Sequence, residues 1–294
     1  MTIDTAGLKR LLAEQFPKWA HLSLEPFSST GTVNAIYRLG EDMVVRLPFD
    51  EEGSEQVKKE YRWLPVLAPY LPLAVPAPLV RGSPGESYPW HWSVYRWLPG
   101  ENGIGGRIDD PYQTAVLLGQ FVEALHGLDA SGGPPPGRHN FFRGVPLATR
   151  DAAVRQATGE LSGLMNTDAI LRAWERALQA PLWQGVPVWF HGDLLAGNLL
   201  FEQGRLSAVI DFGGLAVGDP ACDWLFAWNL LSVADRDKLR GAFSIDDATW
   251  ARSRGWALSV GVIALPYYAS YNPVFAGVAR RLIEEALADH REGV

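Results

Sequence analysis

The residues best suited to chemistry lie in the second half of the chain, around a predicted hairpin. Asp193 and Asn198 belong to the segment HGDLLAGN, and Asp211 opens the segment DFG further along. Between them, the apolar runs 199–201 and 206–210 flank a Glu-Gln-Gly turn, which is typical of two strands joined tightly. Because a hairpin brings its two ends together, we expect the two carboxylates and the amide to project into one pocket.

This cluster offers oxygen atoms, the ligands that Mg²⁺ prefers, and Mg²⁺ completes its shell with water and phosphate oxygens. Phosphoryl transfer needs a base that orients the acceptor hydroxyl, metal ions that bridge the phosphates and a cover over them. The cluster therefore indicates metal-dependent phosphoryl transfer. The formal net charge of −7 gives no general attraction to a polyanion, so bound phosphates require such local cations.

Residues 191–198 and 211–213 resemble the catalytic loop and metal motif of the protein-kinase-like fold, in the variant of the aminoglycoside phosphotransferase and choline kinase families. The continuation GDPACD at 218–223 is similar to the aminoglycoside phosphotransferase-like group, to which macrolide phosphotransferases are related. The resemblance implies an α+β, two-lobed fold. Residues 1–98 would form a nucleotide-binding N-lobe with an antiparallel sheet, and 99–294 a mainly helical C-lobe with the catalytic loop and the acceptor site.

The resemblance also implies a role for each residue of the cluster. Asp193 is the expected catalytic base, Asn198 and Asp211 are the expected Mg²⁺ ligands, and His191 supports the loop. The expected reaction moves the γ-phosphoryl group of ATP, with GTP as the alternative donor, to a hydroxyl group of a small molecule. The expected acceptor is an aminoglycoside-type antibiotic.

A loop of small residues between two strand-like runs resembles the loop that covers the phosphates in this family, with backbone N–H groups and hydroxyls as donors. A plain hairpin turn is the alternative interpretation. The residues of this loop are Ser28, Ser29, Thr30, Gly31 and Thr32.

Arg46 stands on the third predicted strand, where the family usually places a lysine that contacts phosphate. Arginine binds phosphate through two donors and pairs with carboxylates, and Glu60 is the best candidate partner. Its planar head is not equivalent to an ammonium group, which leaves the choice between ATP and GTP open. Tyr95 and Trp97 fall where the hinge between the lobes would offer backbone groups to the purine.

The spacing of apolar residues and the positions of turn residues predict the helices and strands around these positions. An amphipathic helix opens the chain, three antiparallel strands follow up to residue 47, and a proline-rich stretch at 69–89 suits edge strands. After the hairpin the pattern is helical to the end, and the apolar stretch 256–269 predicts a core helix that ends near Pro266. The other predicted helices are 51–67, 112–128, most of 151–178 and 276–287, and the other strands are 92–98 and 186–190.

Composition sets the broad class. With 294 residues, 47% of them hydrophobic, the chain suits one large domain or two lobes and excludes global disorder. The single cysteine, Cys222, cannot form an intramolecular disulfide and suits a reducing compartment. We expect a cytoplasmic protein that binds neither nucleic acid nor a membrane.

The acceptor is the least determined part. In the family it binds to the helical lobe, where Asp223, Trp228 and Tyr268 are candidate contacts, although Asp219 and Asp223 equally suit a helix N-terminus. Carboxylates would favour an aminoglycoside, and aromatic walls a macrolide. A kinase of an amino-alcohol or a sugar fits the same motifs, and so does a non-catalytic nucleotide-binding relative. A protein kinase is disfavoured, because 218–220 follows the DFG segment without room for an activation segment.

Overall fold

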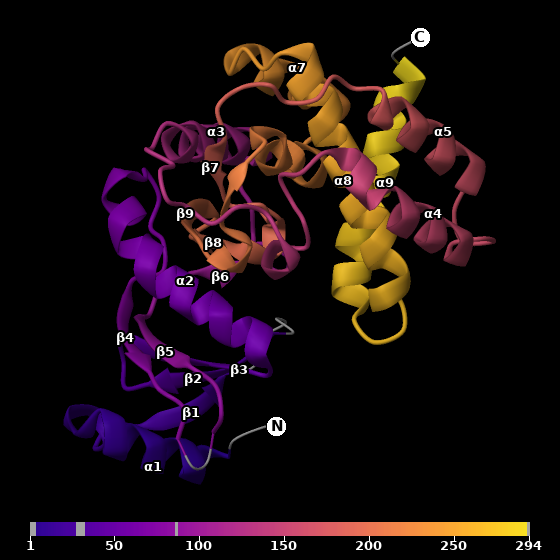
Figure 1. The fold of residues 1–294 in the computed structure, drawn as a ribbon. Coiled ribbons are helices and arrows are strands. Elements are labelled where there is room, and N and C mark those ends of the chain that lie inside the picture. Colours follow the sequence, from indigo (N-terminus) through magenta and orange to yellow (C-terminus); the bar gives the residue numbers. More distant parts are fainter. Residues whose placement is uncertain (1–3, 28–32, 86–87, 293–294) are drawn as a thin grey trace. The chain divides into compact units, whose positions relative to one another are not determined.

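A computed structural model describes residues 4–27, 33–85 and 88–292 (Figure 1). The predicted phosphate-covering loop at 28–32 lies outside these residues. No helix in the described part is long and apolar enough to cross a membrane.

The chain divides into two compact units. The N-terminal unit comprises residues 1–99 and 208–213, and the C-terminal unit comprises 100–207 and 214–294. The segment 208–213 belongs to the N-terminal unit because Ala208 forms a parallel bridge with Ala74, and the N–H of Val209 donates to Ala74 O at 2.9 Å. The expected boundary after residue 98 does not account for this segment. Its backbone pairs with the N-terminal unit, although it comes much later in the chain.

The N-terminal unit is an antiparallel five-stranded sheet in the order β1-β2-β3-β5-β4, with the predicted three strands at its start (Figure 1). β4, which begins at Pro78, lies at the edge, where a missing N–H is tolerated. The elements are α1 (Thr5–Gln15), β1 (Leu24–Phe27), β2 (Asn34–Leu39), β3 (Met43–Pro48), α2 (Glu51–Leu67), β4 (Pro78–Gly82) and β5 (Trp92–Arg96).

Side chains alternate along β3, so the two faces of this sheet carry different kinds of residue. Val45 and Leu47 are buried on the face that packs against α1, with Leu8, Leu11 and Leu12. Arg46 points to the opposite face, towards α2, where it meets Glu60. The sheet therefore places its apolar core on one side and a charged site on the other.

The C-terminal unit is mainly helical. Its helices are α3 (Pro111–His126), α4 (Asp151–Glu160), α5 (Thr167–Leu178), α6 (Phe226–Leu230), α7 (Val233–Ala242), α8 (Asp247–Tyr268) and α9 (Pro273–Glu292). Its strands are β6 (Glu101–Asn102), β7 (Val188–Phe190), β8 (Leu199–Glu202), β9 (Arg205–Val209) and β10 (Ala216–Gly218). The last two residues of β9 belong to the N-terminal unit.

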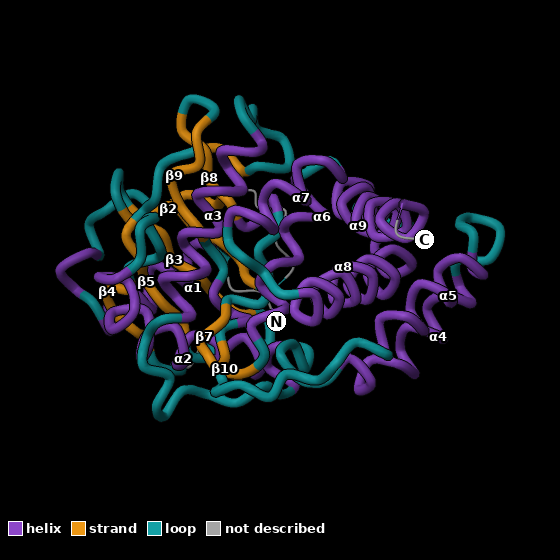
Figure 2. Tube along the Cα trace, turned by 90° about the horizontal axis from the view of Figure 1, so that it is seen from above, coloured by secondary structure: helices purple, strands orange, loops and turns teal. Residues whose placement is uncertain are grey.

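The helices α8 and α9 lie side by side and form the largest helical pair of the C-terminal unit (Figures 1 and 2). Asp246 begins α8 by accepting a hydrogen bond from the N–H of Thr249 at 2.9 Å. The predicted core helix at 256–269 is the second half of α8, and it continues past Pro266 to Tyr268.

Two short strands were not predicted, β6 and β10. β10 pairs antiparallel with β7, with Ala216 opposite Phe190 and Val217 opposite Trp189. The expectation of helix alone after β9 is therefore wrong at this point. A run of three residues is too short to show a strand period, and its structure comes from pairing with β7.

Candidate active site

In the predicted catalytic loop (191–198) of the C-terminal unit, the Asp193 carboxylate has a side-chain contact at each of its oxygens. The Asn198 amide donates to the Asp193 main-chain oxygen at 2.8 Å and to Oδ2 at 2.9 Å. Arg143 Nη1 lies 2.9 Å from Oδ1. Asp193 and Asn198 are thus brought together as expected, whereas no sequence pattern pointed to Arg143.

The same contacts use only the amide nitrogen of the Asn198 side chain. Both N–H bonds of its amide are directed at Asp193, so the amide oxygen is the atom left for a cation. In the N-terminal unit, Asp211 adopts a left-handed backbone (φ 63°) and keeps its carboxylate half-exposed. Among the described residues no group of three His, Cys, Asp or Glu side chains could hold a metal. Each of the two side chains offers an oxygen ligand of the kind that Mg²⁺ takes beside water and phosphate.

Asp223 anchors the catalytic loop and is fully buried. Its Oδ2 accepts from the backbone N–H of His191 at 3.0 Å, and its Oδ1 accepts from that of Gly192 at 2.6 Å. His126 Nε2 lies 3.1 Å from Oδ2. The expectation that Asp223 contacts the acceptor is therefore wrong, because both of its oxygens are committed inside the protein.

His191 is also fully buried, and its Nδ1 accepts a hydrogen bond from the N–H of Asp193 at 3.1 Å. This contact supports the loop just before the carboxylate. Asp219 caps the following short helix by accepting from the N–H of Ala221 at 3.0 Å, and it pairs with the buried Arg252 at 2.7 Å. The interpretation of Asp219 as a helix N-cap is confirmed.

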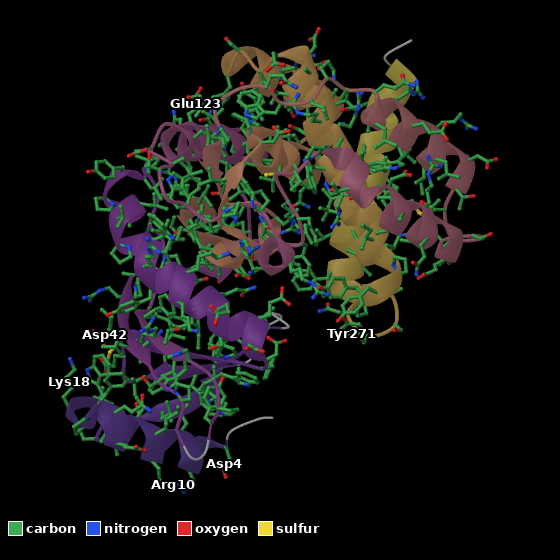
Figure 3. All side chains as sticks on the ribbon, viewed as in Figure 1. Asp4, Arg10, Lys18, Asp42, Glu123 and Tyr271 are labelled. Atoms are coloured by element: carbon green, nitrogen blue, oxygen red, sulfur yellow. The ribbon has the colours of Figure 1, made fainter. Side chains whose placement is uncertain are left out.

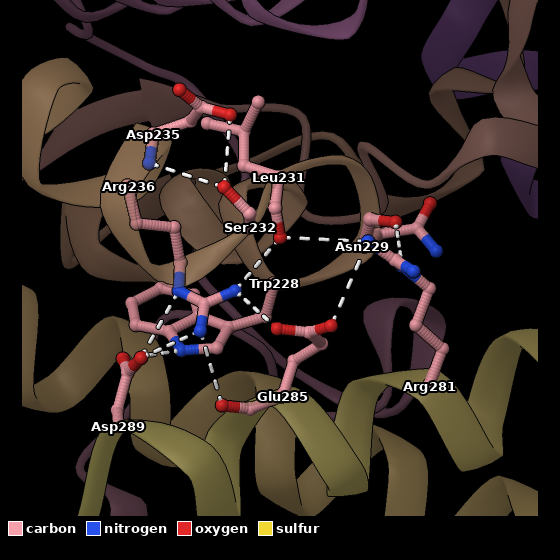
Figure 4. A network of polar contacts seen from close by, with 9 residues as sticks. All are labelled: Trp228, Asn229, Leu231, Ser232, Asp235, Arg236, Arg281, Glu285 and Asp289. Atoms are coloured by element: carbon pink, nitrogen blue, oxygen red, sulfur yellow. Dashed lines mark hydrogen bonds and ion pairs between the residues drawn. The ribbon is translucent and has the colours of Figure 1, made fainter. Parts of the chain in front are cut away.

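A polar network joins Asn229 to α9 (Figure 4), and Asn229 also contacts the predicted catalytic loop. Asn229 Oδ1 accepts from the N–H of Ala196, and its main-chain oxygen accepts from Arg281 Nε at 2.6 Å. The buried Arg236 pairs with Glu285 at 2.7 Å and with Asp289 at 2.6 Å. α9 therefore supports the loop through Asn229, which contacts both.

The same network includes Trp228, which is fully buried and donates its indole N–H to Asp289 Oδ2 at 2.8 Å. Burial removes Trp228 from the candidate acceptor contacts. Tyr268 remains partly exposed, and its ring stacks on Phe275 with centroids 5.2 Å apart.

A second cluster lies within the N-terminal unit. Arg46 Nη1 is 2.9 Å from Glu60 Oε2, as the sequence predicts, and Arg46 Nη2 is 3.8 Å from Asp211 Oδ1. Burial opposes the charge of Arg46, but the carboxylates of Glu60 and Asp211 outweigh it and raise the pKa of the guanidinium. The cation is therefore permanent and held in place.

Lys59, the neighbour of Glu60 on α2, was not among the predicted site residues. Its ammonium donates to Gly213 O at 2.5 Å, in the DFG segment. Burial lowers its pKa to about 8, although Glu60 and Asp211 act in the opposite direction. The only available signal was its place beside Glu60 on the predicted helix.

Tyr95 and Trp97, the residues expected at the hinge, have other partners inside the N-terminal unit. The Tyr95 hydroxyl donates to Glu60 Oε2, which fixes the partner of Arg46. The Trp97 backbone N–H donates to Asp42 O at 2.7 Å, and the Trp97 ring lies under the Arg38 guanidinium. Trp97 therefore has no backbone N–H left to offer to a purine.

The comparison with protein families identifies the class. The model of the phosphotransferase enzyme family (APH) matches residues 23–256. The match covers most of the chain, so the protein belongs to the phosphotransferase enzyme family. A search of curated proteins found no match.

Solved structures show the same fold. The GDP complex of wild-type aminoglycoside 2'-phosphotransferase-IIIa is 20% identical, with a TM-score of 0.71 over 98% of this chain and 100% of that one. Macrolide 2'-phosphotransferase MphH from Brachybacterium faecium is 24% identical, with a TM-score of 0.61 over 97% of each chain. The streptomycin–ATP–APH(2″)-IIa ternary complex is 19% identical, with a TM-score of 0.57 over 97% and 98%. The predicted α+β protein-kinase-like fold is confirmed.

Proposed function

We propose that this phosphotransferase moves the γ-phosphoryl group of ATP, or of GTP, to a hydroxyl group of a small molecule. The observation that carries the proposal is the Asp193 carboxylate of the loop 191–198, whose Oδ2 accepts a hydrogen bond from Asn198. Phosphoryl transfer needs a base that orients the acceptor hydroxyl, and this carboxylate supplies one. The solved relatives support a nucleotide donor, since their complexes contain GDP or ATP.

Each remaining residue then has a task. Asp193 orients the acceptor hydroxyl and takes its proton. Asn198 and Asp211 hold Mg²⁺, which when bound neutralises charge on the phosphates. Arg46, fixed by Glu60, contacts the phosphates as the permanent cation of the N-terminal unit. In the non-catalytic alternative, the retention of Asp193, Asn198 and Asp211 together has no explanation.

For the acceptor, the α8–α9 hairpin favours a molecule with an apolar face. Residues 255–279 contain no charged side chain. Four aromatic rings gather there, those of Tyr267, Tyr268, Tyr271 and Phe275, and Tyr267 and Tyr271 are more than half exposed (Figure 3 labels Tyr271). The Phe275 ring reaches the catalytic loop, within 3.5 Å of where a Cβ on Gly197 would stand.

A polycationic aminoglycoside would need carboxylates at this surface, whereas aromatic walls suit a macrolide-type acceptor. We therefore place the macrolide-type acceptor first and the aminoglycoside-type acceptor second. The latter is supported by the acidic net charge of the chain and by the streptomycin complex of a relative.

The experiment is a screen of nucleotide consumption over macrolides, aminoglycosides, amino-alcohols and sugars, with ATP and with GTP. We expect turnover with one hydroxylated class, strongest for macrolides. Nucleotide binding without turnover on any acceptor would favour the non-catalytic alternative.

The cluster in the N-terminal unit gives a testable prediction. Glu60→Gln removes the charge of the buried member of the ion pair with Arg46, and breaking a buried ion pair costs about 3 to 5 kcal/mol. We expect lower stability and about tenfold weaker nucleotide binding, equal to about 1.4 kcal/mol, in calorimetric titration. The matched control is Glu55→Gln on the same helix, whose exposed pair with Lys58 contributes about 0 to 1 kcal/mol. Equal nucleotide affinity in the two variants would contradict the role of Arg46.

The aromatic residues of the α8–α9 hairpin give a second testable prediction. Tyr268→Ala removes a stacked ring next to Phe275, and an aromatic pair contributes about 0.5 to 1.5 kcal/mol. We expect KM for a macrolide-type acceptor to rise about three- to tenfold, while KM for the nucleotide stays the same. Tyr70→Ala, which removes an exposed tyrosine of the N-terminal unit, serves as the control. An unchanged acceptor KM would place the acceptor elsewhere.

A further inference from the structure

The loop between α3 and α4 has an unusual backbone. Phe141 and Phe142 both adopt the left-handed region, with φ of 55° and 56°, and Gly144 follows with φ of 83°. Two consecutive bulky residues in this region are strained, and such strain persists only where the surroundings enforce it.

Burial of the two rings does not explain the strain. The side chains of Phe141 and Phe142 are 58% and 46% exposed. A loop that folded to bury phenyl rings would place them in the core, so the strained backbone serves another group of the loop.

Hydrogen bonds from the buried Asn140 and from Arg150 enforce this backbone. Asn140 is fully buried, accepts from the N–H of Gly137 at 2.9 Å and donates to Arg143 O at 3.0 Å. Arg150 Nη1 donates to Phe141 O at 2.8 Å. The bonds to Phe141 O and Arg143 O hold the main chain on the two sides of Phe142. They therefore fix the direction in which Arg143 leaves the loop.

Gly144 seats the end of the loop against the core of the C-terminal unit. A Cβ there would come within 2.4 Å of the Phe190 ring, at the end of β7, one residue before the catalytic loop. Its carbonyl accepts from the N–H of Asp219 at 3.1 Å. The residue before Gly144 is therefore delivered to the start of the catalytic loop.

That residue is Arg143, whose side chain is 12% exposed and whose Nη1 lies 2.9 Å from Asp193 Oδ1. Among the residues that the structure describes, Oδ1 has no hydrogen-bond partner, so this ion pair is the contact that holds it. The other oxygen is held by Asn198. An ion pair on one oxygen and a hydrogen bond on the other, from two separate segments, thus hold the carboxylate on both sides.

We propose that Arg143 is a positioning residue for the reaction: it fixes the Asp193 carboxylate in the orientation that receives the acceptor hydroxyl, and the strained loop exists to place it. This inference rests on the proposed function, in which Asp193 is the base. A base acts only when its oxygen is within hydrogen-bond reach of the proton it takes, so a loose carboxylate loses turnover rather than binding.

The test is a double-mutant cycle with Arg143→Met and Asp193→Asn, measured as phosphorylated acceptor per unit time. We expect Arg143→Met to lower kcat about 10- to 100-fold with both KM values unchanged, and Arg143→Lys to recover part of the loss. In the Asp193→Asn background, Arg143→Met should have no further effect, because Arg143 acts through that carboxylate. Arg155→Met, which breaks an exposed pair with Asp151, is the matched control.

Three results would overturn the inference: unchanged kcat in Arg143→Met, a rise in KM alone, or losses that multiply in the double variant. Thermal melts of each variant separate loss of fold from loss of turnover. If Arg143→Met does not fold, the ratio of kcat between Arg143→Lys and Arg143→Gln decides, and equal values overturn the inference. Full turnover by Asp193→Asn would instead refute the proposed function, so the two failures are distinguishable.

Discussion

Asp193→Asn is expected to lower phosphoryl transfer about 10²- to 10⁴-fold, the usual contribution of a positioned general base. The amide has nearly the shape of the carboxylate and keeps an oxygen for Asn198, but it cannot take the proton of the acceptor hydroxyl. Nucleotide binding is expected to stay within about twofold, since other residues are proposed to contact the phosphates. The measurement is kcat with the best acceptor of the screen, together with nucleotide affinity by calorimetry.

The control for this variant is Asp168→Asn, which changes an acidic residue in the first turn of α5. It should leave kcat unchanged. A tenfold or smaller loss in Asp193→Asn would mean that another group takes the proton, and loss of nucleotide binding together with kcat would mean that the variant is misfolded.

Asp223→Ala is expected to cause a large loss of stability. It removes the acceptor of two buried backbone N–H groups, those of His191 and Gly192, and the partner of His126. Each unsatisfied buried donor costs about 1 to 3 kcal/mol, so we expect the free energy of unfolding to fall by about 3 kcal/mol or more. Turnover should fall as well, because the released backbone leads directly into Asp193.

Chemical denaturation measures this loss. Asp110→Ala is the matched control, since it also removes a carboxylate that accepts from a backbone N–H, but at the exposed start of α3. That cap is worth about 1 kcal/mol. Similar losses in the two variants would contradict the role of Asp223 as the buried anchor of the catalytic loop.

The fold was predictable where local signals were strong. Proline and glycine punctuation separated the strands of the N-terminal sheet, and the apolar spacing of 51–67 marked α2 with its observed bounds. The pairing of Arg46 with Glu60 followed from the family resemblance, which implies a cation on the third strand, and from the carboxylate of the helix after it. β10 could not be predicted, because its three residues carry no period and depend on β7 for their hydrogen bonds.

Residue type alone did not decide which side chains are exposed. Asp223 and Trp228 look like surface contacts for an acceptor, yet both are buried. Asp223 accepts a hydrogen bond from the loop 191–198, and Trp228 donates one to Asp289 of α9. Arg143 and Lys59 lie far from the motifs in sequence, and only the folded loop and helix bring them to Asp193 and Gly213. Long-range placement of this kind leaves no local pattern.

The most direct test is the stoichiometry of the reaction. Purified protein is incubated with Mg²⁺, γ-labelled ATP or GTP and a hydroxylated acceptor, and the nucleoside diphosphate and the labelled acceptor are both counted by mass and label. We predict one phosphorylated acceptor for each nucleoside diphosphate formed, with neither product when Mg²⁺ is chelated. Nucleotide that binds tightly while no acceptor gains a phosphoryl group, or diphosphate formed with label only in inorganic phosphate, would contradict the proposed phosphotransferase activity.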